Sequence, residues 1–345
     1  MKIKKTTITT LRRLLCLTLL PWITTACLYE HPELTGDGEQ GIDPTEVNVN
    51  INLSLNLKIE GTEQAETRIT AKAETRADAP VYRHRLIVDA YLDRQLAARQ
   101  VIYKEITAAE ELSAALNMKL HARDYQLVVW ADYVEAGNEE DPFYNTTTLI
   151  PALNSGSYQG NTEYKDVLYA SRPLALSRYR DQWNTEVPVA MELQRPVARY
   201  ELIADDVAKF LRKITDGEVT GNKFTATVRY TGFFSTGFNA LDGIAKNALQ
   251  YISYSFSFPP PTAETEELKV GLDYVFVPDG EANIPIAVEV TDASGNLIAR
   301  TYLLLQCKSG QSQTIRSNFL TADPSGGVGF DPDYDGSIDE DIEIE

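Results

Sequence analysis

Val47-Asn-Val-Asn-Ile-Asn-Leu-Ser-Leu-Asn-Leu-Lys-Ile59 is the stretch of sequence that decides the fold. Apolar and polar side chains alternate through it without a break, which is the two-residue period of a β-strand that buries one face. The stretch therefore predicts a long strand of a sandwich. Its buried face should consist of Val47, Val49, Ile51, Leu53, Leu55, Leu57 and Ile59, and its outward face should carry Asn48, Asn50, Asn52 and Asn56.

Strand-like runs continue toward the C-terminus, separated by turn residues. Helical periodicity is scarce, and residues 108–118 and 205–214 are the best candidates for short helices. Many short strands without strand–helix alternation predict an all-β fold with minor helix, built as antiparallel β-sandwiches. The further predicted strands span residues 84–92, 100–106, 125–134, 187–193, 199–204, 223–233, 251–258, 269–277, 284–290, 297–306, 313–320 and 329–344.

The chain has 345 residues, which is enough for two domains with separate cores. A boundary near Gln194-Arg195-Pro196 falls between two strand runs. Residues 28–46 are polar, acidic and rich in turn formers, as expected of a tether. We therefore divide the chain into a signal peptide (1–26), a tether (27–46), an N-terminal sandwich domain (47–194) and a C-terminal sandwich domain (195–345).

The first 26 residues have the pattern of a secretory signal. A basic start, MKIKKTTITTLRR, precedes LLCLTLLPWI, an apolar run too short to span a bilayer. The following Thr24-Thr25-Ala26-Cys27 resembles the lipobox of bacterial lipoproteins, in which the cysteine receives acyl chains such as palmitate. The alternative is an ordinary signal whose cleavage site abuts a cysteine. We expect lipidation of Cys27, which leaves Cys307 without a partner for an intrachain disulfide.

Composition argues against several classes of function. Asp and Glu total 50 against 32 Lys and Arg, so the formal net charge is −18, which repels nucleic acid and anionic lipid head groups. Three histidines leave little material for zinc sites or imidazole catalysis. The sequence also holds neither a G-x-S-x-G elbow nor a complete phosphate loop. We therefore predict a protein that is not an enzyme and that needs no cofactor.

An acidic loop near the C-terminus is a weak calcium candidate. Asp331, Asp333, Asp335 and Asp339 match the first carboxylate positions of an EF-hand loop. Ile342 stands where a closing glutamate should bind the ion in a bidentate manner, and no amphipathic helix precedes the loop. The alternative is a turn into a last strand, and on balance we predict no metal site.

Residues 60–79 form a polar stretch of low complexity between the first two predicted strands. Arg68, Lys72 and Arg76 punctuate it. The simpler interpretation is a solvated linker. The functional alternative is a cleavage site for a trypsin-like protease, with Arg76 the best-placed residue.

Three segments carry a family resemblance. They are YQLVVWADYVEAG (125–137) with Phe143-Tyr-Asn145, MELQRPVARYELI (191–203) with VRYTGFF (228–234), and QTIRSNFLT (313–321) with GFDPDYDG (329–336). Together with the lipobox they resemble the fimbrillin-like surface lipoproteins of Bacteroidetes, the superfamily that builds type V pili, and most closely a subgroup without an assigned activity. The resemblance implies two transthyretin-like β-sandwich domains, surface display, and an assembly or adhesive role without catalysis. In shaft subunits, proteolysis after Arg or Lys removes a first strand, and residues 47–59 followed by Arg76 have the matching order here.

Two functions of different classes follow. The leading hypothesis is a lipoprotein of fimbrial or adhesin type, anchored in the outer membrane through Cys27, exposed at the surface or part of a fimbrium. Its partners would be other fimbrillin-like subunits or host or bacterial surface ligands, and it would act by strand pairing and protein contacts. The alternative is a glycan-binding lipoprotein of a nutrient-uptake system, which would need an aromatic platform on one sheet face.

Overall fold

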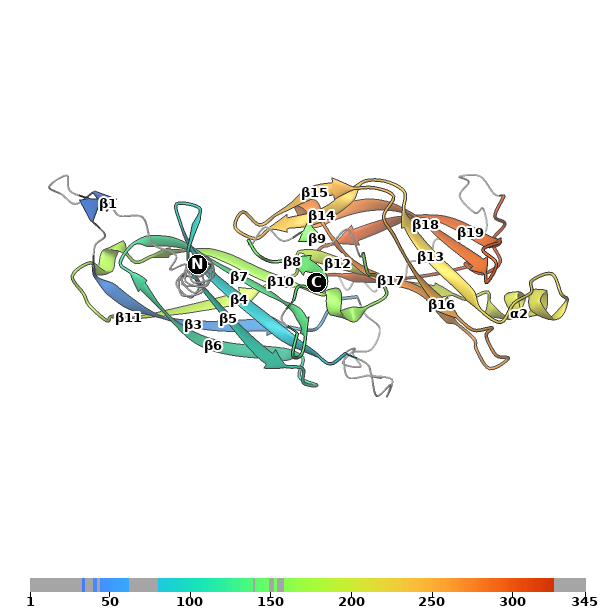
Figure 1. Cartoon of the computed structure of the whole chain (residues 1–345), viewed down its shortest axis with the longest axis horizontal. Helices are drawn as coiled ribbons and strands as arrows, with labels where there is room; N and C mark the ends of the chain where they lie inside the picture. The colour runs from blue at the N-terminus through green and yellow to red at the C-terminus, as the bar shows by residue number, and fades with distance from the viewer. Residues whose placement is uncertain are drawn as a thin grey trace, which may run out of the picture.

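The computed structural model describes residues 33–34, 40–41, 44–61, 80–138, 140–148, 152–153 and 158–325. Figure 1 shows two β-rich lobes that follow one another along the long axis, with α2 at the far end of the second lobe. The strands are β1 (Glu33–Leu34), β2 (Gln40–Gly41), β3 (Glu46–Asn56), β4 (Tyr82–Leu92), β5 (Gln95–Glu105), β6 (Glu111–His121), β7 (Asp124–Glu135), β8 (Tyr144–Asn145), β9 (Ala152–Leu153), β10 (Leu168–Ala175), β11 (Glu186–Leu193), β12 (Val197–Ala204), β13 (Phe224–Tyr230), β14 (Phe234–Asn239), β15 (Ile244–Leu249), β16 (Ser253–Phe258), β17 (Leu268–Phe276), β18 (Glu281–Asp292), β19 (Leu297–Lys308) and β20 (Ser312–Ser317). The helical elements are α2 (Val207–Thr215) and the short 3-10 turns η3 (Glu163–Lys165), η4 (Ser177–Tyr179) and η5 (Pro278–Gly280).

The N-terminal lobe is a sandwich of two sheets. One has the strand order β10-β7-β4-β5, and the other has the order β11-β3-β6. The apolar alternation of β3 supplies one side of the core between them, and β4 and β7 supply the facing side through residues such as Leu86, Val88 and Val129. All pairings in this lobe are antiparallel except β11 with β3, which run parallel.

The C-terminal lobe is a second pair of sheets. One contains β20-β12-β17-β14-β9-β8 with β15 added to β14, and the other has the order β16-β13-β18-β19. Here too one pairing, β12 with β20, is parallel. The all-β prediction is therefore confirmed, with two parallel pairings that period-two patterns cannot reveal because they do not encode strand direction.

The two lobes share a core. The sheet β10-β7-β4-β5 turns one face toward β3 and presents Ile87, Val128 and Trp130 to the core of the second lobe. The ring of Trp130 lies 6.3 Å from that of Phe238 and 6.5 Å from that of Phe276. The side chain of Trp130 is fully buried between these rings. Burial of this sheet on both faces holds the lobes together as neighbours.

The predicted helix over residues 108–118 is wrong. The segment is strand β6, in which Ala114, Met118 and Leu120 are buried on alternate positions and pair with β3 over its whole length. Leucine and alanine favour helix locally, but the two-residue period of this segment matches the sheet that β3 offers. The second predicted helix is confirmed as α2. Strands β10, β14 and β15 and the two-residue strands β1, β2, β8 and β9 were not predicted, and the predicted strand 329–344 lies outside the described residues.

Candidate functional site

β3 occupies the centre of its sheet, between two strands that come much later in the chain. It pairs antiparallel with β6 from Glu46 to Asn56 and parallel with β11 from Asn48 to Leu55. Every backbone group of a central strand can be used in its two ladders. The first strand of the described lobe is thus held by distant segments and is not half of a hairpin.

The burial of β3 follows the predicted alternation along the strand itself. Val47, Val49, Ile51, Leu53 and Leu55 are all at most 2% exposed and belong to the core of the N-terminal lobe. The prediction fails at the end of the run, because the strand stops at Asn56. Leu57 is only partly buried, and Ile59 is buried in the shared core of the other lobe.

Loops hold the N-terminal end of β3 in place. The Thr45 carbonyl accepts a hydrogen bond from the Ala122 amide, and the Thr45 hydroxyl accepts one from the Asp181 amide at 3.0 Å. The Glu46 carbonyl accepts a hydrogen bond from the Asn184 amide at 2.8 Å. The strand therefore begins against the loop between β10 and β11.

Arg195 clamps the other end of β3 at the junction of the lobes. Its guanidinium donates hydrogen bonds to the carbonyl oxygens of Asn56 at 3.0 Å and Lys58 at 2.9 Å. The same side chain forms a forked ion pair with Asp166, with contacts of 3.0 to 3.1 Å, and both side chains are more than nine-tenths buried. A planar guanidinium has five donors in a fixed fork, so it can serve both carbonyls and both oxygens of the carboxylate at once, whereas an ammonium has only three donors on one nitrogen.

Burial and charge oppose each other in this clamp. Desolvation raises the pKa of the Asp166 carboxyl, and the Arg195 guanidinium works against that rise. Beyond the clamp, the chain continues into the second lobe, where the Ser312 amide donates to the Glu60 carbonyl at 2.8 Å. Gly61 has φ +79°, and a Cβ there would lie 2.5 Å from the Ser312 carbonyl oxygen, so the turn requires glycine.

A buried polar cluster lies behind the clamp in the shared core. The Lys165 amine contacts the Asp273 carboxylate, and both side chains are at most 1% exposed. The hydroxyls of Tyr158 and Tyr230 donate to the other carboxylate oxygen at 2.5 and 2.7 Å. Burial lowers the pKa of the Lys165 amine, opposed by the charge of Asp273. The cluster fixes the segment that carries Asp166, because the Tyr144 hydroxyl also donates to the Lys165 carbonyl.

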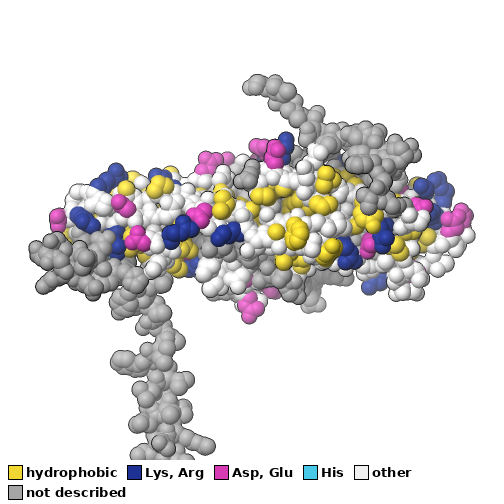
Figure 2. Space-filling model, turned by 90° about the horizontal axis from the view of Figure 1, so that it is seen from above, with side chains coloured by type: hydrophobic (Ala, Val, Ile, Leu, Met, Phe, Trp, Pro, Cys, Tyr) yellow, Lys and Arg dark blue, Asp and Glu magenta, His cyan; other side chains and the backbone are white. Residues whose placement is uncertain are grey.

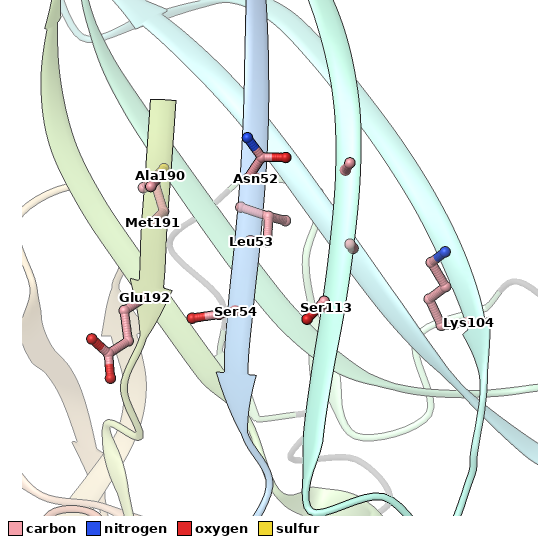
Figure 3. A pocket seen from close by; sticks show the side chains of 10 residues that line it. Asn52, Leu53, Ser54, Lys104, Ser113, Ala190, Met191 and Glu192 are labelled. Atoms are coloured by element: carbon pink, nitrogen blue, oxygen red, sulfur yellow. The ribbon is translucent and has the colours of Figure 1, made fainter. Parts of the chain in front are cut away.

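The outward face of the β11-β3-β6 sheet is polar and slightly hollowed. The Glu186 carboxylate accepts hydrogen bonds from the side-chain amides of Asn48 at 2.9 Å and Asn50 at 2.5 Å. Beside them lies an open hollow of about 700 Å³ (Figure 3). Its lining consists of Asn52, Leu53, Ser54, Lys104, Ser113, Ala114, Ala115, Ala190, Met191 and Glu192. None of these is aromatic, so the hollow does not supply the platform that the glycan-binding alternative needs.

Several residues singled out from the sequence lie outside the described residues. These are Cys27, Arg76 and the four aspartates Asp331, Asp333, Asp335 and Asp339. Within the described ranges, no group of three or more His, Cys, Asp or Glu side chains could hold a metal ion. No described helix is long and apolar enough to cross a membrane. Cys307 is a free thiol buried in β19.

Sequence reasoning missed the clamp. In the sequence Arg195 marks only a boundary between two strand runs, and Asp166 carries no signal because single charged residues are common in so acidic a chain. The arginine joins segments 29 and 139 positions away. The parallel pairing of β11 with β3 brings Arg195 to the end of β3, and the antiparallel bridge between Tyr169 and Gln194 brings the segment of Asp166 beside it.

The model of DUF6562, a family of unknown function, matches residues 44–345. No curated protein matches the chain. Similar solved structures include a candidate cell adhesion protein of Parabacteroides distasonis at 11% identity, with 80% of this chain and 92% of that chain covered and a TM-score of 0.40. They also include a candidate cell adhesion protein of Bacteroides eggerthii at 12% identity, with coverage of 84% and 95% and a TM-score of 0.39.

A third similar structure is the tip fimbrial protein Mfa3 of Porphyromonas gingivalis with a C-terminal truncation, at 10% identity, with coverage of 79% and 94% and a TM-score of 0.35.

Proposed function

The chain belongs to the family of unknown function DUF6562, and we propose that it is a non-catalytic surface protein of fimbrial or adhesin type whose first strand, β3, is exchangeable. The observation that carries this proposal is the position of β3. It is the first strand of the N-terminal sandwich, yet it fills the centre of a sheet whose other two strands do not pair with each other. Both neighbours would keep free backbone edges if β3 left.

Removal of β3 would open a groove suited to one strand. Neighbouring strands lie about 4.8 Å apart, so β6 and β11 would be separated by about 10 Å. The five buried side chains of β3 would leave apolar cavities in the groove. Burying these side chains again would contribute roughly 8–15 kcal/mol before conformational entropy is subtracted. Such a groove either aggregates or captures another strand, and strand addition is a common way in which sheets bind partners.

The flanking sequence fits the same function. Residues 60–79 follow β3 directly, and cleavage after Arg76 would separate the strand covalently from the rest of the lobe. We further propose that Cys27 carries the lipid anchor and that the protein is displayed at the outer membrane or in a fimbrium. Other subunits that offer an alternating strand would then be its partners.

Limited proteolysis tests the exchange directly. The mature protein is digested with trypsin, intact mass identifies the cut after Arg76, and the sample is warmed with a biotin-labelled peptide of residues 46–57. We expect the peptide to be retained, and we expect ladders of oligomers in its absence. Retention of the peptide equally well by the uncut protein, or a cut protein that stays monomeric after warming, would contradict the proposal.

Two variants serve as controls. Arg68→Gln/Lys72→Gln/Arg76→Gln removes every trypsin site between residues 60 and 79, so this variant should resist the cut and neither form ladders nor retain the peptide. A peptide in which aspartate replaces the residues at the positions of Ile51 and Leu53 keeps the backbone pattern but loses the apolar side chains, so it should not bind. If that peptide binds as well as the native one, the groove does not recognise the alternation of β3.

A further inference from the structure

The loop between β10 and β11 presents an exposed tryptophan at the free end of the N-terminal lobe. Trp183 is 54% exposed, and Arg178 and Arg180 nearby are also exposed. Arg178 lies 4.9 Å from the centre of the Tyr179 ring, and its guanidinium also donates to the Tyr179 hydroxyl. Tryptophan, tyrosine and arginine are the residues that most often anchor protein contacts.

This loop is held rigidly by its backbone. The amides of Gln182 and Thr185 donate to the carbonyls of Tyr179 and Gln182, and the Thr185 carbonyl accepts from the Asn48 amide at 2.9 Å. Asp181 and Asn184 adopt φ of +65° and +55° on either side of Trp183. Left-handed conformations at non-glycine residues are costly and persist only where the surrounding contacts impose them. Trp183 therefore lies on a loop whose backbone conformation is fixed by hydrogen bonds.

The opposite end of the molecule carries a loop of complementary chemistry. Residues 259–267, between β16 and β17, contain three consecutive prolines and then Glu264, Glu266 and Glu267. A turn fixes the loop, since the Thr265 amide donates to the Thr262 carbonyl at 3.0 Å. Prolines favour an extended conformation that docks against aromatic side chains with little loss of entropy.

The two loops lie at the two ends of the long axis. The loop with Trp183 leads into β11, and β11 lies at the left end in Figure 1, whereas the loop 259–267 joins β16 to β17 on the side of α2. Figure 2 shows Lys and Arg side chains at both ends of the molecule, so the end with Trp183 is distinguished by the aromatic side chain that its arginines accompany. A chain with a net charge of −18 thus has one end where exposed arginines flank an aromatic side chain.

We propose that the loop 177–185 of one copy docks on the loop 259–267 of a second copy, so that molecules associate end to end. The Trp183 ring would pack on the proline run, and Arg178 and Arg180 would face Glu264 and Glu266. The contact uses two different surfaces of the same chain, so it does not close on itself and can repeat into a row. It needs no cleavage and no exchange of β3, and it holds or fails independently of the function proposed above.

A contact between two loops is small. Interfaces below about 1,200 Å² are weak or transient, so we expect a dissociation constant of about 0.1–1 mM. At a crowded surface such contacts act many at a time, which raises the overall strength by orders of magnitude. Overall negative charge opposes association at long range, but salt at physiological strength screens charges beyond about 8 Å.

Sedimentation velocity of the intact mature protein from 10 µM to 1 mM tests the proposal. We expect the weight-average sedimentation coefficient to rise with concentration in 50 mM salt and to rise less in 500 mM salt. Trp183→Ala should remove the rise. Phe233→Ala is the matched control, because Phe233 is 67% exposed and lies outside both loops, and it should behave like the unaltered protein. A protein that stays monomeric at 1 mM, or a Trp183→Ala variant that associates as before, overturns the proposal.

Charge reversal makes the test specific to the two loops. Arg178→Glu/Arg180→Glu and Glu264→Arg/Glu266→Arg should each abolish self-association. A mixture of the two variants should associate again in alternation, because each loop of one variant then meets a loop of opposite charge on the other. A single chain that carries all four changes should also associate. A peptide of residues 257–268 should quench the fluorescence of Trp183, with Trp183→Phe as the control. Failure of both the four-change chain and the peptide would place the contact elsewhere and refute the assignment.

Discussion

Replacement of Arg195 by methionine tests whether the clamp retains β3. Methionine has a similar length and no charge, so the change removes the donors without leaving a large cavity. The hydrogen bonds to the carbonyls of Asn56 and Lys58 are lost, and Asp166 is left buried without its partner. The variant therefore weakens the end of β3 and leaves its core side chains untouched.

The expected cost follows from the burial of the pair. Removal of one partner of a buried ion pair costs about 3–5 kcal/mol because the remaining charge is uncompensated. The two carbonyl bonds are part of the same change and do not add fully, so we expect about 4 kcal/mol of lost unfolding free energy at pH 7. The double variant Arg195→Met/Asp166→Asn should recover a large part of this loss.

The loss should also depend on pH. Burial already raises the pKa of Asp166, and without the arginine that pKa rises further. A carboxyl whose pKa is higher in the folded state than in the unfolded state prefers the folded state when protonated. The deficit of Arg195→Met should therefore shrink as the pH falls through the raised pKa of Asp166 and grow again as the pH increases.

Urea unfolding and hydrogen exchange measure the two parts of the argument. Unfolding gives the free energy, and exchange of the amides of β3 compared with those of β18 gives the local opening of the strand. Arg172→Met is the matched control, because Arg172 also donates to a carbonyl, that of Ala190, but is exposed. It should cost less than about 0.5 kcal/mol. If Arg195→Met costs under about 1 kcal/mol, or if β3 opens no faster relative to β18 than in the unaltered protein, Arg195 does not clamp the strand.

Three further predictions concern single sites. Burial lowers the pKa of His84 to about 4, so the unfolded state takes up a proton as the pH falls below about 6.5 while the folded state does not. Between pH 7 and 4.5 the unfolding free energy of the unaltered protein should therefore fall by about 2 kcal/mol more than that of His84→Gln, as measured by urea titration. Equal losses would contradict the burial of a neutral imidazole. Ile51→Ala should cost about 2–5 kcal/mol and Asn52→Ala less than about 0.5 kcal/mol in the same assay, and a reversed order would place the wrong face of β3 in the core. Lys165→Met should lower the unfolding free energy by about 3–5 kcal/mol, because Asp273 is left buried without its cation, and calorimetry showing an unchanged melting temperature would disprove that reading.

The most accurate predictions from the sequence were those that rest on the two-residue alternation of apolar and polar side chains. The alternation of β3 predicted its buried and outward faces, and burial confirms them from Val47 to Leu55. The same criterion was available in β6, where Leu112, Ala114, Leu116 and Met118 also alternate, but alanine and leucine outweighed it and led to a helix. Local propensity was misleading there because the partner strand lies some 60 residues earlier in the chain.

The site was predictable in part for the same reason. An exchangeable strand could be proposed from residues 47–59, because its evidence is local. The clamp could not be predicted, since Arg195, Asp166 and the carbonyls of β3 meet only through the order of strands in two sheets. Likewise, which core buries Ile59 depends on where β3 ends. The alternation in the sequence continues past that point without a break and therefore does not reveal it.

The position of the clamp has a consequence for exchange. All described residues of β3 and of its exit as far as Gly61 precede residues 62–79, and their partners in other segments all follow that stretch. A cut after Arg76 would therefore break none of these non-covalent contacts. A cut protein should therefore keep β3 until a competing strand or heat removes it. Release of β3 must also remove Ile59 from the shared core and break the hydrogen bond between Glu60 and Ser312. Both of these contacts are made with the second lobe. Retention of the first strand is thus tied to the junction of the lobes, and loosening that junction should speed exchange even when the groove itself is unchanged.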